Sequence, residues 1–114
     1  MDNLMSIRLR AVNPAINVDR VYKVTLGQDL FNQWYVRVAF GRYNTGGASK
    51  TRYFDTREEA CRFMDAQLKR RLSSPGRIGC PYQVVSAEGN DKTLETASKK
   101  MVERFSWFSP PEVG

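Results

Sequence analysis

The sequence contains no histidine among its 114 residues. This absence excludes serine–histidine–aspartate and cysteine–histidine catalysis, together with every metal site that uses an imidazole ligand. The composition therefore argues against most enzymes, and we expect a protein without catalytic residues. We also expect no cofactor and no bound metal, although a magnesium site made of carboxylates alone stays open, because Mg²⁺ needs few protein ligands.

Cysteine is scarce as well. Cys61 and Cys80 stand 19 positions apart and form no C-x-x-C motif, so they cannot supply the four thiolates of a structural zinc site. The first residues show neither the basic start nor the apolar stretch of a secretory signal. We therefore expect two reduced thiols in a cytoplasmic protein, with a disulfide as the less favoured alternative.

Long apolar runs are missing too. No run approaches the roughly 18 residues that a membrane helix needs, so we expect no membrane-spanning segment and no membrane partner. Hydrophobic residues make up 41% of the chain and charged residues 26%, which is typical of a globular rather than a disordered protein. A chain of 114 residues is too short for two independent cores.

Positive charge is unevenly distributed. The 18 basic and 12 acidic side chains leave a net charge of +6. Residues 34–82 alone hold ten basic and four acidic side chains, so nearly the whole excess lies in the middle of the chain. Basic residues gathered in one segment favour a polyanion as partner. The charge alone is also compatible with a merely soluble basic protein.

Period-two alternation of apolar and polar residues predicts four successive strands. They cover residues 6–12, 20–26, 34–40 and 49–54. The connections between them are short, with a proline in the first and two adjacent glycines in the last. Because strands joined by short connections pair antiparallel, we expect an antiparallel sheet.

A helix follows these strands directly. Thr56 and Glu59 fit a capping box, in which both side chains satisfy free N–H groups of the first helical turn. Apolar side chains then recur at helical spacing, at Ala60, Met64, Leu68 and Leu72. Two serines, a proline and a glycine at residues 73–76 are expected to end the helix.

Two further elements are expected after this helix. Residues 82–85 predict a short final strand, and Asn90 or Asp91 is expected to cap a second helix. Its apolar face would be formed by Leu94, Ala97, Met101 and Phe105. That face needs either the sheet or a second subunit to pack on, and two prolines at residues 110–111 end regular structure. The order of elements predicts an α+β fold.

Residues 34–54 interleave aromatic and cationic side chains. The rings are Trp34, Tyr35, Phe40, Tyr43 and Tyr53, and the cations are Arg37, Arg42, Lys50 and Arg52. Rings can stack on a base or a sugar while cations contact phosphate oxygens. Alternation also assigns Trp34 and Phe40 to one face of their strand together with two valines, so both rings could instead form core. Trp34 is the stronger core candidate, whereas for Phe40, at the strand's end, both roles stay open.

At these residues the sequence resembles the WGR domain family, which is named for a Trp-Gly-Arg triplet at the end of a central strand. Here the triplet is Phe40-Gly41-Arg42. The other matching motifs are Tyr22-Lys23-Val24, Trp34, Gly46-Gly47, Ser49-Lys50, the helix start at residues 54–60, and a basic helix end followed by Tyr82. The resemblance covers roughly residues 6–83, and its specificity lies in the order and spacing of these short motifs.

The resemblance implies a small twisted antiparallel sheet with a helix packed across one face. WGR domains occur in poly(ADP-ribose) polymerases, where they bind DNA near strand breaks, and in many small bacterial proteins. In the DNA-binding members the aromatic residue of the motif packs on the sugar of a terminal nucleotide and its arginine organises contacts, and the matching residues here are Phe40 and Arg42. Phenylalanine lacks the indole N–H donor of tryptophan but keeps a face that can stack. We expect no ADP-ribosyl transfer, because the chain carries no polymerase catalytic domain.

These observations predict a non-catalytic module, in which residues 1–86 form a WGR-like domain and residues 87–114 form a C-terminal helical extension. The predicted partner is DNA or another nucleic acid. The candidate binding residues are Phe40, Gly41, Arg42, Lys50, Arg52 and Arg37. The alternative is a protein-interaction or homodimerisation module, which would use the C-terminal helix and bind no nucleic acid. The nucleic-acid hypothesis requires the cations of the third and fourth strands to share one exposed surface.

Overall fold

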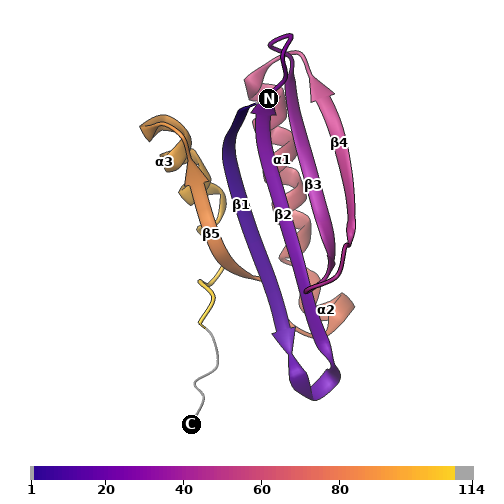
Figure 1. The fold of residues 1–114 in the computed structure, drawn as a ribbon. Coiled ribbons are helices and arrows are strands. Elements are labelled where there is room, and N and C mark those ends of the chain that lie inside the picture. The colour runs from indigo at the N-terminus through magenta and orange to yellow at the C-terminus, as the bar shows by residue number, and fades with distance from the viewer. Residues whose placement is uncertain (1, 110–114) are drawn as a thin grey trace.

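The structure, a computed structural model, describes residues 2–109 of the chain. Five strands form one sheet in the order β4-β3-β2-β1-β5 (Figure 1). The strands are β1 (Asp2–Asn13), β2 (Val18–Gln28), β3 (Trp34–Arg42), β4 (Ala48–Phe54) and β5 (Gln83–Gly89). All neighbouring strands are antiparallel, so the expected α+β fold with an antiparallel sheet is confirmed.

The turn between β1 and β2 shows why the chain reverses there. A single 3₁₀ turn, η1 (Pro14–Ile16), follows Asn13, whose side chain accepts a hydrogen bond from the backbone N–H of Ala15. Asn17 then adopts the left-handed conformation, with φ at 54°. Asparagine tolerates this conformation better than most residues, and proline is favoured at the start of such turns. The turn therefore follows from the local sequence.

The first long helix, α1 (Arg57–Arg71), begins at the predicted cap. The Thr56 hydroxyl accepts a hydrogen bond from the backbone N–H of Glu59 at 3.2 Å. Figure 1 shows α1 running along one face of the sheet, where it contacts β2, β3 and β4. Met64 and Leu68 are fully buried in this contact, and each burial contributes about 1.5–3 kcal/mol.

Alternation along the strands divides the sheet into two faces. The helix face is covered by α1 over β2, β3 and β4 and by α3 over β1. It carries most of the buried side chains of the first three strands, among them Met5, Ile7, Leu9, Tyr22, Val24, Leu26, Val36 and Val38. The register places Val24 opposite both Ile7 and Val38, so these side chains form one continuous layer. We call the opposite side of the sheet the open face.

The first helix ends at Arg71, next to residues 73–76, where the sequence predicted its end, but the chain does not then leave helical structure. A second, five-residue helix, α2 (Ser74–Ile78), forms there, with its proline in the first turn, where no N–H is needed. The buried hydroxyl of Ser74 donates to the carbonyl of Cys80 at 3.0 Å and accepts from the backbone N–H of Tyr82 at 3.2 Å. These two bonds direct the chain back into β5.

The C-terminal part of the described chain completes the same core. Asp91 caps α3 (Lys92–Met101) by accepting a hydrogen bond from the backbone N–H of Leu94 at 2.8 Å. The helix packs on β5 and β1, and Leu94, Val102 and Phe105 belong to the single hydrophobic core. Of the two packing partners that the sequence left open, the sheet is therefore the one observed. The expected proline stop at residues 110–111 lies outside the described residues.

The final strand is longer than residues 82–85, and the expected boundary between residues 86 and 87 falls inside it. β5 extends to Gly89 because it pairs along its length with β1. A Cβ atom at Gly89 would lie 2.3 Å from the backbone nitrogen of Glu95, so only glycine allows α3 to approach this closely. Across residues 2–109, no helix is both long and apolar enough to cross a membrane.

Candidate functional site

The triplet Phe40-Gly41-Arg42 lies at the end of β3, where the next hairpin turn begins. The register pairs its members with Tyr22, Val21 and Arg20 of β2, respectively. A Cβ atom at Gly41 would lie 2.7 Å from the Cα of Gly47, and one at Gly47 would lie 2.6 Å from the carbonyl oxygen of Phe40. The turn is thus folded tightly against the strand end, and glycine is required on both sides of this contact.

Phe40 is neither wholly in the core nor wholly exposed. Its side chain is half-buried and packs against the core on the helix face. It also lines a cavity of about 210 Å³, which we call the arginine pocket. The lining residues are Arg20, Phe40, Gly41, Arg71, Ser74, Arg77, Ile78 and Tyr82. One part of the ring therefore supports the fold while another remains accessible from the cavity.

Three elements bring the arginines of this pocket together. Arg20 comes from β2, Arg71 from the last turn of α1, and Arg77 from α2. A cation in the last turn of a helix is favoured by the helix dipole, which explains the position of Arg71. None of the three forms an ion pair with a carboxylate among residues 2–109. Their positive charges are therefore not neutralised by neighbouring groups of the chain.

The charges of the arginines affect the pKa values of two neighbouring tyrosines, Tyr82 and Tyr22. Burial raises the pKa of the Tyr82 phenol, while the charges of Arg71, Arg20 and Arg77 act on it in the opposite direction. Burial likewise raises the pKa of Tyr22, and here Arg71 and Arg70 oppose it. The Tyr22 hydroxyl is buried without a hydrogen-bond partner in the part of the chain that is described. An unsatisfied buried hydroxyl costs roughly 1–3 kcal/mol.

Arg42 has a structural partner of its own. Its two terminal nitrogens donate to the backbone oxygen and to the side-chain oxygen of Asn17, at 3.0 and 2.8 Å. These bonds fix the β1–β2 turn against the end of β3. Because Asn17 is neutral, these hydrogen bonds do not neutralise the positive charge of the Arg42 guanidinium. A third residue of this corner, Asp19, has its pKa lowered mainly by a hydrogen bond from Arg10 and further by the charges of Arg10 and Arg42.

The other predicted binding residues, Lys50, Arg52 and Arg37, do not lie beside the triplet. Lys50 pairs with Val38 and Arg52 with Val36, so both lie on the helix face of β4, at the edge of the sheet. The Arg52 guanidinium lies 5.2 Å from the centre of the Phe63 ring of α1. Arg37 has the opposite parity and is exposed on the open face. The expected single surface formed by Arg37, Lys50 and Arg52 is therefore not present.

The open face carries cations that the sequence reasoning did not single out. Arg8 of β1 lies directly opposite Lys23 of β2, and both line a cavity of about 330 Å³ next to the β3–β4 turn. Arg10 is engaged on this face, since it forms an ion pair with Asp19 at 2.9 Å and lies 3.7 Å from the centre of the Tyr43 ring. Arg8 and Lys23 form no ion pair within residues 2–109, so this face also carries cations that are not neutralised.

The arginine pocket was only partly foreseeable from the sequence. The family resemblance includes a basic helix end and Tyr82, which were the available signals for Arg71 and its surroundings. Nothing local pointed to Arg20, because its place beside the triplet depends on the β2–β3 register. Arg77 depends on α2, which residue patterns did not predict.

The cysteines and acidic residues of the described chain are dispersed. No group of three or more Cys, Asp, Glu or His side chains within residues 2–109 is arranged to hold a metal ion. Cys61 and Cys80 are not disulfide-bonded, and burial raises the pKa of both thiols. The acidic residues Glu58 and Glu59 lie in the first turn of α1, where they complement the helix dipole.

The features described so far define a class of small domains that contain a single sheet. They are a triplet at the end of a strand, a tight glycine turn after it, and one helix packed across the antiparallel sheet. The model of the WGR domain family matches residues 5–75, which is more than half of the chain. The chain belongs to the WGR domain family, as the sequence resemblance indicated. No curated protein and no solved structure matches it. The segment from residue 76 onward, including β5 and α3, lies outside the family match.

Proposed function

We propose that this protein is a cytoplasmic, non-catalytic nucleic-acid-binding module whose site is the Phe40-Gly41-Arg42 end of the sheet together with the arginine pocket. The surface of Arg37, Lys50 and Arg52, on which the sequence-based hypothesis depended, is absent, so the proposal depends on a different observation. Arg20, Arg71 and Arg77 converge on Phe40 and Gly41 without a carboxylate partner among the described residues. Gathering like charges costs free energy, which a polyanionic partner offsets.

The chemistry of the pocket fits a sugar–phosphate chain. Arginine presents a planar set of donors that can bind phosphate in a bidentate manner. The rings of Phe40 and Tyr82 line the same cavity, and a ring that stacks on a base contributes roughly 1–3 kcal/mol without sequence preference. DNA binding by WGR domains of poly(ADP-ribose) polymerases, at the motif's aromatic and arginine, supports the same location. The preferred ligand we propose is DNA.

The decisive experiment compares two arginine variants by fluorescence anisotropy on nicked and blunt DNA duplexes. Arg20→Ala removes a pocket arginine that has no ion pair, and Arg62→Ala removes an exposed arginine of α1 outside the pocket. We expect Arg20→Ala to weaken binding by roughly five- to tenfold, and Arg62→Ala to change it by less than about twofold. Equal effects of the two variants, or no binding at low salt, would contradict the proposal.

A second candidate function, contact with another protein chain, is favoured by the tip of the β2–β3 hairpin. Leu30 and Phe31 are 83% and 88% exposed there. Asp29 fixes their backbone, because its carboxylate accepts hydrogen bonds from the N–H groups of Phe31 and Gln33 at 2.9 and 3.0 Å. Sedimentation velocity of the protein and of a Leu30→Ser/Phe31→Ser variant tests whether this tip supports self-association. A monomer at all concentrations excludes a homodimer.

A further inference from the structure

Three cavities adjoin one another on the helix side of the molecule. The arginine pocket shares Arg71 and Tyr82 with a second cavity of about 210 Å³. The second cavity shares Leu72, Arg104 and Phe105 with a third of about 370 Å³, which lies between α1 and the end of α3. The three cavities therefore follow one another from the triplet to the C-terminal segment, and we call this row of cavities the extension groove.

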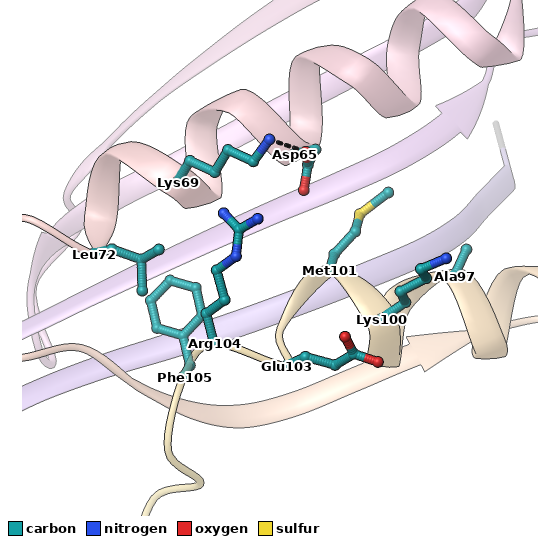
Figure 2. A pocket seen from close by; sticks show the side chains of 9 residues that line it. All are labelled: Asp65, Lys69, Leu72, Ala97, Lys100, Met101, Glu103, Arg104 and Phe105. Atoms are coloured by element: carbon teal, nitrogen blue, oxygen red, sulfur yellow. Dashed lines mark ion pairs between the residues drawn. The ribbon is translucent and has the colours of Figure 1, made fainter.

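Figure 2 shows how the third cavity is built. Lys69 and Asp65 form one wall from α1 and are ion-paired at 3.0 Å. The other wall comes from α3 and the residues after it, and the Arg104 side chain reaches from there towards α1. The apolar lining is formed by Leu72, Ala97, Met101 and Phe105. The cavity thus has an apolar lining between charged walls.

The charge along the groove is predominantly positive. Its cations are Arg20, Arg71, Arg77, Lys69, Lys100 and Arg104, and its acidic residues are Asp65 and Glu103. Asp65 is already paired with Lys69, whereas Lys100 and Arg104 form no ion pair with any residue from 2 to 109. Lys100 and Arg104 lie beyond residue 75, where the family match ends. The C-terminal extension therefore lengthens the basic surface that begins at the triplet.

The volumes of the cavities indicate whether single-stranded or double-stranded nucleic acid fits the extension groove. The third cavity, of about 370 Å³, has the volume of a small-molecule site, and the two of about 210 Å³ are smaller, so each has room for parts of single nucleotides rather than for a duplex. Unpaired bases are held by apolar or aromatic surfaces while cations follow the phosphates. From this we infer that the extension groove binds a single-stranded segment of nucleic acid that continues from the end of a duplex seated at Phe40, with Arg104 and Lys100 contacting its phosphates. The inference rests on the proposed function.

The experiment uses the full chain and compares a blunt DNA duplex with the same duplex carrying a single-stranded overhang of about six nucleotides, on either strand. For the unmodified protein we expect the overhang to raise affinity by roughly five- to tenfold. A Lys100→Ala/Arg104→Ala variant should lose this gain and keep its affinity for the blunt duplex. The control is Arg62→Ala/Lys92→Ala, which removes the same charge from exposed sites outside the groove.

The outcomes separate this inference from the proposed function. If no duplex binds at low salt, both are wrong. If the blunt duplex binds through Arg20 but the overhang adds nothing, only the inference is wrong. Only the inference is wrong, too, if the Lys100→Ala/Arg104→Ala variant and its control lose the affinity gained from the overhang to the same extent. Displacement of the overhang by a poly-glutamate peptide of equal charge, at equal concentration, would show that the groove is an acidic-peptide site instead. Lys100 and Arg104 are exposed, so the variant should fold normally, which circular dichroism checks.

Discussion

The Arg71 guanidinium lies 4.1 Å from the centre of the Tyr22 ring, and this contact joins the end of α1 to the middle of the sheet. A cation over an aromatic face contributes roughly 0.5–2 kcal/mol and leaves the N–H groups at its edge able to donate. Tyr82 flanks the same ring, with the two ring centres 6.4 Å apart. Arg71 is therefore held in place by the Tyr22 ring rather than by a carboxylate, and its charge remains available to a ligand.

Replacing Tyr22 by phenylalanine tests the unsatisfied hydroxyl beneath this arginine. The variant keeps the ring under Arg71 and removes a buried polar group that has no partner among the described residues. We expect the free energy of unfolding to stay the same or to rise by about 1 kcal/mol. Urea denaturation measures it. A loss of more than about 1 kcal/mol would mean that the hydroxyl is hydrogen-bonded in solution.

Phe40→Leu separates the two roles of Phe40. Leucine keeps much of the apolar volume on the helix face but cannot stack on a sugar or base, so we expect DNA affinity to fall by roughly five- to tenfold. Because the residue is half-buried, the free energy of unfolding should fall by only about 1 kcal/mol. Anisotropy and urea denaturation on the same preparation give both values. Unchanged affinity with lower stability would assign the ring to the core alone.

A matched pair of glycine variants tests the tight turn after the triplet. Gly47 has φ at 59°, and a Cβ atom there would lie 2.6 Å from the carbonyl oxygen of Phe40, whereas Gly46 has nothing within 4 Å. We expect Gly47→Ala to lower the free energy of unfolding by roughly 1–3 kcal/mol, and Gly46→Ala to lower it by less than about 1 kcal/mol. Thermal unfolding compares the two. Equal stability of both variants would show that the turn rearranges freely.

The Arg10–Asp19 ion pair predicts a pH dependence of stability. The hydrogen bond from Arg10 lowers the pKa of Asp19 in the folded protein, so the pair stabilises the fold at pH values above the usual carboxyl pKa. This contribution is lost as the pH falls through the lowered pKa. The side chains are 23% and 26% exposed, so we expect about 1 kcal/mol or less. Asp19→Asn has no carboxylate at this position, so its free energy of unfolding should not show this decrease at acid pH. Parallel curves for both proteins below pH 4 would exclude the contribution.

Salt dependence measures how many phosphates the module contacts. If Arg20, Arg42, Arg71 and Arg77 each neutralise one phosphate, log K should fall against log salt with a slope of roughly −3 to −4 on duplex DNA. Arg20→Ala should make the slope less steep by about one. Anisotropy titrations at several salt concentrations give both slopes. A slope near zero would contradict binding through phosphates.

Much of the fold was predictable because its signals are local. The caps at Thr56 and Asp91 each consist of a side chain and a backbone N–H only three residues away. In β1, every second residue from Met5 to Ala11 is buried, as the alternation of the sequence predicted. In contrast, β5 extends beyond the predicted residues because it pairs with β1, which is distant in the sequence. The helix α2 depends on the hydrogen bonds of a buried Ser74, which no residue pattern reveals.

The site was less predictable than the fold, and β4 shows the reason. Nearly all of its side chains are exposed, so it lacks an apolar pattern that would tell which of its residues face the helix. Only the pairing of Lys50 with Val38 shows that Lys50 and Arg52 lie on the opposite side of the sheet from Arg37. A one-residue shift in register would have reversed this result.

The sequence by itself determined the α+β class, the four-strand succession and the capped helices, since each rests on residues close together in the chain. It also determined the membership of the WGR family, through the order and spacing of short motifs. The tertiary structure alone decided which cations meet. Arg20, Arg71 and Arg77 are brought together by the β2–β3 register and by the fold of α1 and α2. Electrostatic surfaces form between segments that are distant in sequence, and therefore only long-range packing shows where positive charge accumulates.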